Sequence, residues 1–194
     1  MKYRSSHLIY SFSHSIVMLA LFFSPTLQAK DAHLLDWGDL APEGYFESLE
    51  KEQESMLGGL FDGIGFGDEE DDESEEAQNA YSELQNKLRA APIVKELNGK
   101  YVKIPGYIVP LDIDFEKGTF SEFLLAPYFG ACIHVPPPPS NQIIHVKPAN
   151  PLKQKWLDDA VWVTGTITTD SIDSEYGFAG YSMNEVDLKV YDGE

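Results

Sequence analysis

The sequence predicts a mainly β protein, namely a small OB-like Greek-key barrel of about five strands with one or two short helices and a disordered acidic N-terminal extension. Three observations support this prediction. Five or so β-rich segments follow residue 100 and are separated by turn-forming residues. Between the third and the fourth, residues 152–160 are expected to form one or two helical turns. Residues 58–76 are too rich in glycine and acid to fold.

Residues 1–29 are predicted to be a secretory signal peptide. Lys2 and Arg4 precede an apolar run at 16–23, and Leu27-Gln28-Ala29 follows it. The run is too short to span a bilayer, so we expect no transmembrane segment in the mature chain. Cleavage near Ala29 predicts a periplasmic or secreted protein, and the alternative is an uncleaved N-terminal anchor.

Residues 30–67 are predicted to form an N-terminal arm, in which Trp37 packs on the folded domain and 45–57 form a short helix. An acidic disordered linker is expected at 68–79, because eight of the nine residues in 68–76 are acidic and repel one another. Such a run can also collect Ca²⁺ weakly, although it lacks the spacing of an EF-hand loop.

The OB-like barrel domain is predicted to span residues 80–194. A helical pattern over 77–97, interrupted by Pro92, leads into it. Pro105 and Pro110 lie inside the first β-rich segment and indicate bulges or bends. The β-rich segments are 101–113, 120–125, 142–147, 161–168 and 182–191.

The net charge excludes several classes of partner, and the cysteine content excludes an internal disulfide. The full chain has a net charge of −18, and loss of Lys2 and Arg4 with the leader makes the mature chain more negative still. Nucleic acids and anionic lipids need positive potential, so neither is expected as a partner. The single cysteine allows no internal disulfide, and it is a free thiol, a ligand or half of an intermolecular bridge.

One proline-rich stretch contains the only cysteine and two of the three histidines outside the leader. If 131–135 and 142–147 are both extended, successive side chains alternate between two faces. Cys132, His134 and His145 then share one face, opposite four aliphatic side chains that suit a core. These are Ile133, Val135, Ile144 and Val146. A thiolate and two imidazoles suit Zn²⁺ or copper with an open or water-filled fourth position.

A second interpretation of the same residues stays open. A lone cysteine is most often a small buried hydrophobic residue, and strand histidines commonly lie at the surface or form ordinary hydrogen bonds. The sequence has no CxxC and no HExxH motif. In this interpretation Cys132 is buried, and the stiff run of prolines at 136–139 is a docking rod or a rigid loop at the edge of the core.

Four strings of residues resemble an uncharacterised family of bacterial exported proteins, known as a domain of unknown function. They are WGDLAP at 37–42, KIPGYIVPLD at 103–112, EFLLAPYFGACIHVPPPPSNQIIHV at 122–146 and VWVTGTI at 161–167. The most specific part is GACIHVPPPP at 130–139. The resemblance covers Trp37 and then residues 102–191.

The resemblance implies an OB-type barrel and a part in handling zinc or another transition metal. Members of the family are often encoded beside ABC-transporter components and zinc-responsive periplasmic proteins, so it implies a transporter or a periplasmic protein as partner. The family has no defined catalytic residues, and none is transferred to this chain.

Three functions follow from these observations. The first is a non-enzymatic exported accessory protein that binds a transition metal, zinc first, through Cys132, His134 and His145, or that supports a metal-related ABC transporter. The second is an interaction module that docks a membrane or periplasmic partner through the proline-rich loop without metal. The third is a thiol-dependent enzyme using Cys132, with His134 or His145 as base and Asn141 to orient it.

Limited proteolysis tests the expected boundary between arm and barrel. We predict the first cuts between residues 57 and 79, leaving a resistant core that starts near residue 80 to 100, because glycine- and acid-rich segments bury too little apolar area to offset chain entropy. Mass spectrometry of the fragments locates the cuts. An intact chain under conditions that digest an unfolded control would contradict the prediction.

Overall fold

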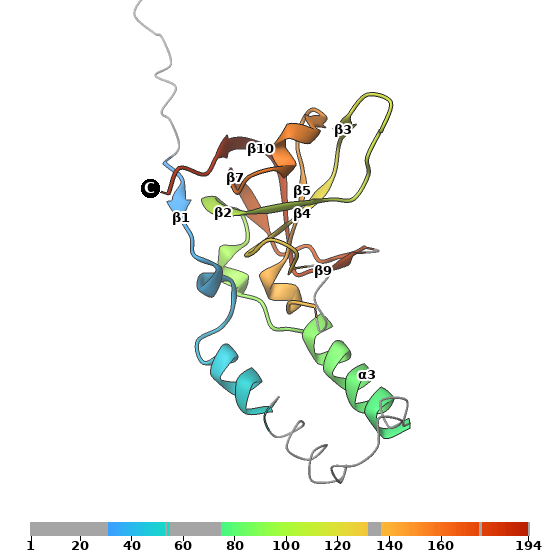
Figure 1. Ribbon diagram of the computed structural model, residues 1–194. Coiled ribbons are helices and arrows are strands. Elements are labelled where there is room, and N and C mark those ends of the chain that lie inside the picture. Colours follow the sequence, from blue (N-terminus) through green and yellow to red (C-terminus); the bar gives the residue numbers. More distant parts are fainter. Residues whose placement is uncertain (1–30, 53, 55–74, 132–136, 175, 194) are drawn as a thin grey trace, which may run out of the picture. The chain divides into compact units, whose positions relative to one another are not determined.

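The computed structural model describes residues 31–52, 54, 75–131, 137–174 and 176–193 (Figure 1). The chain divides into two compact units, residues 1–30 and 31–194, and every described residue belongs to the second. The expected leader and residues 68–74 of the expected acidic linker therefore lie outside the described residues.

The second unit consists mainly of β-strands. They are β1 (His33–Leu34), β2 (Lys100–Pro110), β3 (Thr119–Phe120), β4 (Phe123–Ala126), β5 (Ile144–Lys147), β6 (Leu152–Lys153), β7 (Val161–Thr168), β8 (Ile172–Ser174), β9 (Gly177–Ala179) and β10 (Tyr181–Val190). The helical elements are η2 (Trp37–Leu40), α3 (Glu75–Arg89), η4 (Lys95–Leu97), η6 (Ser140–Gln142) and η7 (Gln154–Leu157), where η marks a 3₁₀ turn. Residues 45–52 are also helical.

Five strands close into a barrel in the order β2-β4-β5-β10-β7, because β7 also pairs with β2 (Figure 1). β5 and β10 are parallel, whereas the other neighbouring pairs of the barrel are antiparallel. The third and fifth barrel strands along the chain are thus the parallel pair, as in an OB-type Greek-key barrel. The predicted mainly β, OB-like barrel is confirmed.

β2 is long enough to pair with two strands in succession. Residues 100–106 pair with β7, and 107–110 pair with β4. The register against β7 is unbroken across Pro105, so this proline does not form the bulge that the sequence indicated. A Cβ atom at Gly106 would lie 2.8 Å from the carbonyl oxygen of Ala126. Glycine at 106 therefore lets β4 approach where β2 changes partner.

A bulge lies in β10 instead. The register against β7 shifts between Asn184 and Asp187, and Glu185 has a left-handed φ of 53°. Val186 fits over Gly165, where an added Cβ atom would lie 2.9 Å from Val186 Cγ1. The bulge bends the strand, so that its first residues pair with both β5 and β7 while its last residues pair with β7.

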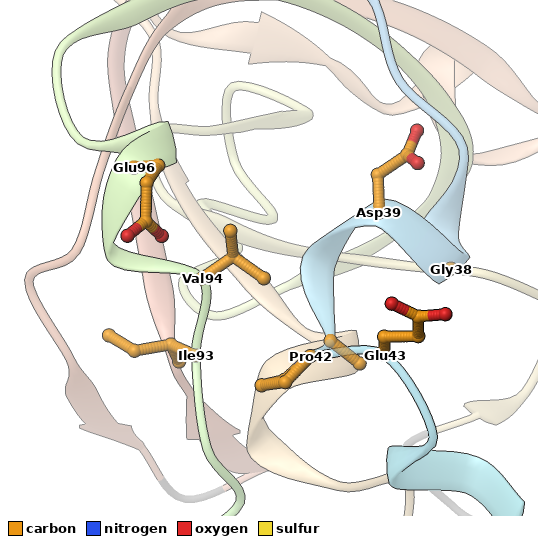
Figure 2. A pocket seen from close by; sticks show the side chains of 8 residues that line it. Gly38, Asp39, Pro42, Glu43, Ile93, Val94 and Glu96 are labelled. Atoms are coloured by element: carbon orange, nitrogen blue, oxygen red, sulfur yellow. The ribbon is translucent and has the colours of Figure 1, made fainter.

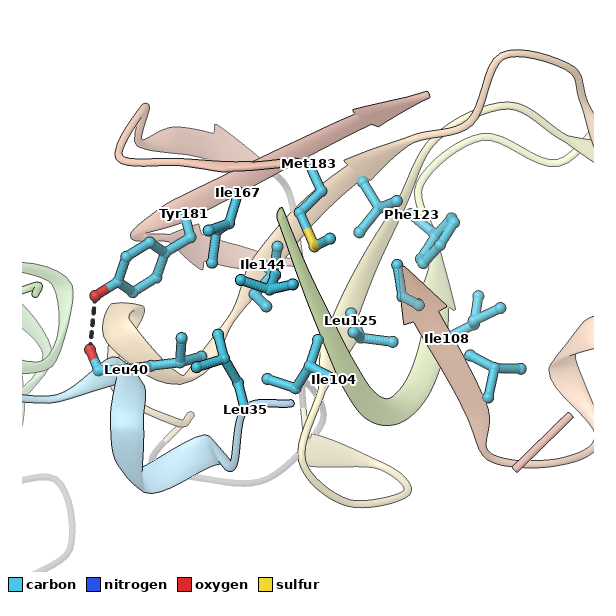
Figure 3. Packing of buried hydrophobic residues seen from close by; sticks show 14 of the residues in the cluster. Leu35, Leu40, Ile104, Ile108, Phe123, Leu125, Ile144, Ile167, Tyr181 and Met183 are labelled. Atoms are coloured by element: carbon cyan, nitrogen blue, oxygen red, sulfur yellow. Dashed lines mark hydrogen bonds between the residues drawn. The ribbon is translucent and has the colours of Figure 1, made fainter. Parts of the chain in front are cut away.

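The barrel core includes two leucines of the N-terminal arm (Figure 3). Leu35 and Leu40 are buried in the same cluster as Ile104, Ile144 and Met183. β1, the first strand of the arm, pairs in parallel with β2 and so attaches the arm to the barrel. Trp37 is partly buried against the cluster, and its Nε1 donates to the carbonyl oxygen of Pro105 at 2.8 Å. The expectation that Trp37 packs on the domain is confirmed.

The fully buried Tyr181, at the start of β10, connects three parts of the chain. Its hydroxyl donates to the carbonyl oxygen of Leu40 at 2.8 Å and accepts from the Val94 amide at 2.6 Å. Figure 3 shows the bond to Leu40. Burial is the main cause that raises the pKa of this hydroxyl. One side chain thus joins the arm and the segment before β2 to the barrel.

α3 begins at Glu75, so the last residues of the segment expected as a linker are helical. Near its C-terminal end, Leu88 is buried and the Arg89 guanidinium lies 3.4 Å from the centre of the Phe178 ring, a cation–π contact with β9. Lys87 forms ion pairs with Glu52 and with Glu83. Among the described residues, no helix has the length and apolar character needed to cross a membrane.

A small second cluster lies outside the main core. Leu124 of β4, Ile143 and Ala179 of β9 form it, with Ile172 of β8 packed against them. A Cβ atom at Gly177 would lie 3.3 Å from Ile143 Cδ1 and 3.8 Å from Leu124 Cδ1. The β8–β9 hairpin therefore covers an apolar part of the β4–β5 surface, the surface that binds ligands in many OB barrels.

Removing the Tyr181 hydroxyl tests how strongly it stabilises the fold. We expect Tyr181→Phe to lower the free energy of unfolding by about 1–3 kcal/mol, because two buried backbone groups lose their partner while the ring remains. Urea denaturation followed by circular dichroism measures the change. Tyr176→Phe, at an exposed tyrosine, is the control and should have little effect. Equal stability of the two variants would contradict the role of Tyr181.

Candidate functional site

Of the three predicted metal ligands, the structure places His145, on β5. Cys132 and His134 belong to residues 132–136, outside the described residues, as do Ile133 and Val135. The structure therefore describes only the part of the predicted site that lies on β5.

β5 alternates as predicted. Ile144 and Val146 are fully buried members of the core cluster. His145 points the other way along the strand and is only 8% exposed. Its partners across the sheet are Leu124 on β4 and Ser182 on β10. The imidazole is thus a nearly buried group on the outer side of the barrel wall.

Glu122 holds His145 and Lys147 together at the start of β4. The Oε2 atom of Glu122 lies 3.2 Å from His145 Nε2, and its Oε1 atom accepts from Lys147 Nζ at 2.6 Å. The Glu122 amide in turn donates to Asp112 Oδ1 at 2.8 Å. Both oxygens of one carboxylate are engaged, which holds its orientation from two sides.

This contact determines which nitrogen of His145 can serve as a ligand. An ionised carboxylate only accepts hydrogen bonds, so the Nε2 atom facing Glu122 carries the proton. In the neutral imidazole the lone pair is then on Nδ1. Histidine ligands of metals commonly donate their other ring N–H to a carboxylate in this manner. Glu122 is therefore placed where an outer partner would lie if Nδ1 of His145 held a metal ion.

The hydrogen bond from Lys147 is the largest influence on the pKa of Glu122 and lowers it. Partial burial acts in the opposite direction, and the hydrogen bond with His145 lowers the pKa further. The net result is a pKa below the usual glutamate range, so this carboxylate is ionised at neutral pH.

Glu122 was not among the residues predicted from the sequence. The signal that could have found it is strand pairing, because β4 and β5 are antiparallel with Phe123 opposite Val146. That register brings the residue before Phe123 next to the one after Val146. Because Glu122 and His145 are 23 residues apart, no local sequence pattern shows that they lie close together.

The end of the proline-rich stretch forms structural contacts. Ser140, Asn141 and Gln142 are all buried. Asn141 Nδ2 donates to the Pro92 carbonyl oxygen at 2.8 Å, and Gln142 Nε2 donates to that of Trp37 at 3.0 Å. The Oδ1 atom of Asn141 is buried without a hydrogen-bond partner among the described residues.

The described prolines of the run are packed against the protein. Pro138 is buried, and Pro137 and Pro139 are half-buried. The Ser140 carbonyl oxygen accepts from the Gly180 amide at 2.7 Å, and a Cβ atom at Gly180 would lie 2.9 Å from that oxygen. These three of the four prolines correspond to a loop at the edge of the core, the second form that the sequence left open for the run.

A cavity of about 480 Å³ opens between the arm and the segment before β2. Figure 2 shows Asp39 and Glu43 on the arm, and Ile93, Val94 and Glu96 on the facing segment. Within the ranges that the structure describes, no three His, Cys, Asp or Glu side chains lie close enough together to hold one metal ion. The cavity is thus acidic and partly apolar, and it is separate from His145.

Replacing Glu122 tests how its contacts with His145 and Lys147 stabilise the fold, through the pH dependence of stability. A carboxyl group whose pKa is lowered by folding stabilises the fold above its unfolded pKa, and the contribution is lost as pH falls. We expect Glu122→Gln to lower the melting temperature at pH 7 and to have a diminishing effect below about pH 4.3, the ordinary glutamate value. The exposed Glu116 supplies the control, Glu116→Gln. If Glu122→Gln lowers the melting temperature by the same amount at pH 7 and at pH 3, the lowered pKa of Glu122 is not what stabilises the fold.

Three comparisons with known proteins were made. No curated protein matches the chain. A solved structure of a DUF3299 family protein from Pseudomonas aeruginosa PAO1 is similar, with 36% sequence identity and a TM-score of 0.60, covering 85% of this chain and 99% of that one. A family model described as "Protein of unknown function (DUF3299)" matches residues 37–190. The chain therefore belongs to the DUF3299 family.

Proposed function

We propose that the protein is an exported, non-enzymatic accessory protein that binds a transition metal, zinc first, through Cys132, His134 and His145. In this proposal it supports a metal-handling ABC transporter, the partner implied by the resemblance described above. The observation that carries the metal proposal is the nearly buried His145 with Glu122 at its Nε2 atom. Membership of a family of unknown function leaves the activity open.

The donor types fit zinc. A thiolate and imidazole nitrogens are ligands that Zn²⁺ prefers, and the carboxylate of Glu122 supplies the outer hydrogen bond that such a histidine usually makes. When bound, zinc would join the loop that carries Cys132 to β5. The core side chains Ile144 and Val146 hold the β5 end of this connection in place.

Asn141 has a structural contact. In the enzyme hypothesis this residue orients the base of a thiol nucleophile, a role in which its Oδ1 atom would accept from an imidazole N–H. Its Nδ2 atom donates to the Pro92 carbonyl oxygen, and the residue is fully buried. This contact joins two segments of the chain and engages the nitrogen of the side chain, not its oxygen.

Zinc titration by calorimetry at pH 7.5 tests the proposal. We expect Cys132→Ser, His134→Ala and His145→Ala each to abolish or strongly weaken binding without unfolding the protein. Glu122→Gln should weaken it about 10- to 100-fold, the usual cost of losing an outer partner. His33→Ala is the matched control, because His33 is exposed on β1 and lies outside the site.

The same titration at pH 5.5 separates this site from the acidic run at 68–76. Thiolate and imidazole ligands must lose their protons to bind, so affinity should fall strongly between the two pH values. Carboxylates stay ionised to about pH 4 to 5 and prefer Ca²⁺ or Mg²⁺. Zinc affinity that disappears when residues 60–78 are deleted, or that is equal at both pH values, would contradict the proposal.

A second candidate function is a docking module without metal. Phe129, three residues before Cys132, is 75% exposed, and its neighbour Tyr128 is also exposed. The Phe129 ring packs edge-on against Tyr107, which orients it. Such exposed aromatic side chains are common anchors of protein interfaces. In the sequence they come directly before the proline-rich stretch through which docking was expected.

Site-specific photocrosslinking in cells tests docking. A benzophenone side chain at position 129 should crosslink to one membrane or periplasmic protein. The matched control is position 115, where Phe115 is 82% exposed in the loop between β2 and β3. A crosslink of the same partner from both positions, or from neither, would argue against docking through this surface.

A further inference from the structure

We propose that the cavity between the arm and the segment before β2 binds a lysine or arginine side chain presented by a basic segment of a partner protein. Its volume of about 480 Å³ falls within the range of about 300–1,000 Å³ that is typical of ligand sites. Its walls come from residues 38–43 and 93–96. This site is separate from the proposed zinc ligands and does not depend on them.

The charges around the cavity are all of one sign. Asp39, Glu43 and Glu96 line it, and no lysine, arginine or histidine does. Within the described residues, none of these three carboxylates forms an ion pair. Asp39 accepts one hydrogen bond through its Oδ2 atom, from the Asp36 amide at 2.8 Å, which leaves its Oδ1 atom for a ligand. The cavity therefore presents uncompensated negative charge.

The remaining walls select the kind of cation. The three carboxylates do not come close enough together to share one metal ion. Ala41, Pro42, Ile93 and Val94 add apolar surface between them. Lysine and arginine combine an apolar stem with a charged head, so the stem can contact these walls while the head meets the carboxylates. An amphipathic organic cation matches this combination better than an inorganic ion does.

The two walls are held in position before any ligand binds. Tyr181 joins Leu40, which lies between the lining residues Asp39 and Ala41, to the lining residue Val94 through one buried hydroxyl. A preformed cavity avoids the entropic cost of ordering the walls on binding.

The occupant is expected to come from another molecule. The long segment of this chain that follows the arm includes the acidic run at 68–76, which carries the same charge as the cavity rim. Like charges repel, so this run is an unfavourable ligand. The strong negative charge of the whole chain also attracts basic partners over distance.

The experiment uses the full mature chain and a blocked pentapeptide, acetyl-Gly-Leu-Arg-Leu-Gly-amide, at 20 mM and 300 mM NaCl. Binding is followed by NMR chemical-shift changes at residues 38–43 and 93–96. Peptides with Lys or Glu in place of Arg, and free spermidine, are the comparison ligands. Two variants change the cavity itself, the double substitution Glu43→Gln/Glu96→Gln and the single substitution Gly38→Arg. A side chain at Gly38 meets no atom within 4 Å of its Cβ position.

We expect the Arg and Lys peptides to bind at low salt and to weaken at high salt, and the Glu peptide not to bind. The Glu43→Gln/Glu96→Gln double variant should bind about fivefold more weakly, since exposed ion pairs each contribute modestly. Gly38→Arg should abolish binding by placing a cation in the cavity, whereas Gly38→Ala should not. The double control Glu116→Gln/Asp159→Asn removes the same charge at exposed sites away from the cavity and should leave affinity unchanged.

Three outcomes would overturn the proposal. They are the absence of peptide binding at 20 mM NaCl, an equal loss of affinity in the cavity variant and the charge-matched control, and binding of spermidine without the peptides. Zinc binding is measured on the same Glu43→Gln/Glu96→Gln protein and should be unchanged. Failure of this proposal is therefore distinguishable from failure of the zinc site.

Discussion

The hydroxyl of Tyr181 is the interaction on which the arrangement of this domain depends. It joins the first residues of β10 to Leu40 of the arm and to Val94 before β2. The next bond along the chain, from the Gly180 amide to the Ser140 carbonyl oxygen, adds the end of the proline-rich loop to the same junction. Four segments that are distant in sequence thus meet at one end of the barrel. Buried polar groups of this kind cost more when unpaired than they contribute when paired, so the junction strongly favours a single arrangement.

The stretch of residues 140–146 has two parts with different physical roles. Ser140, Asn141 and Gln142 are buried and bind backbone groups of other segments, as residues of a structural loop do. His145 lies on the outer side of β5, where its contacts are the side chain of Glu122 and, through it, Lys147. Chemistry or binding at the second part can therefore vary without disturbing the first.

The fold was predictable because its strands alternate. The segments around Ile104, Ile144 and Val163 carry buried aliphatic residues at alternating positions. The OB type was predicted from the number of such segments and from the helical turns expected between the third and the fourth. Three features of the structure could not be predicted from the sequence, each for a physical reason. Leu35 and Leu40 are core residues, but they stand among acids in a segment with no periodicity. Glu122 meets His145 only through the register of β4 and β5. The bulge in β10 depends on the fit of Val186 over Gly165, which is a contact between strands rather than a local pattern.

The bond between Tyr181 and Leu40 spans 141 positions of the chain, and this separation bears on how the domain folds. The arm is synthesised first, yet the hydroxyl that completes its attachment belongs to the last strand. Contacts between residues so far apart must wait for the closure of a long loop, and they form late in folding. Leu35 and Trp37 can meet Lys103 and Pro105 as soon as β2 is made, but the Leu40 carbonyl oxygen has no such partner until β10 follows. During synthesis the arm is therefore an apolar segment in an acidic chain, and its charged neighbours are what keep it in solution.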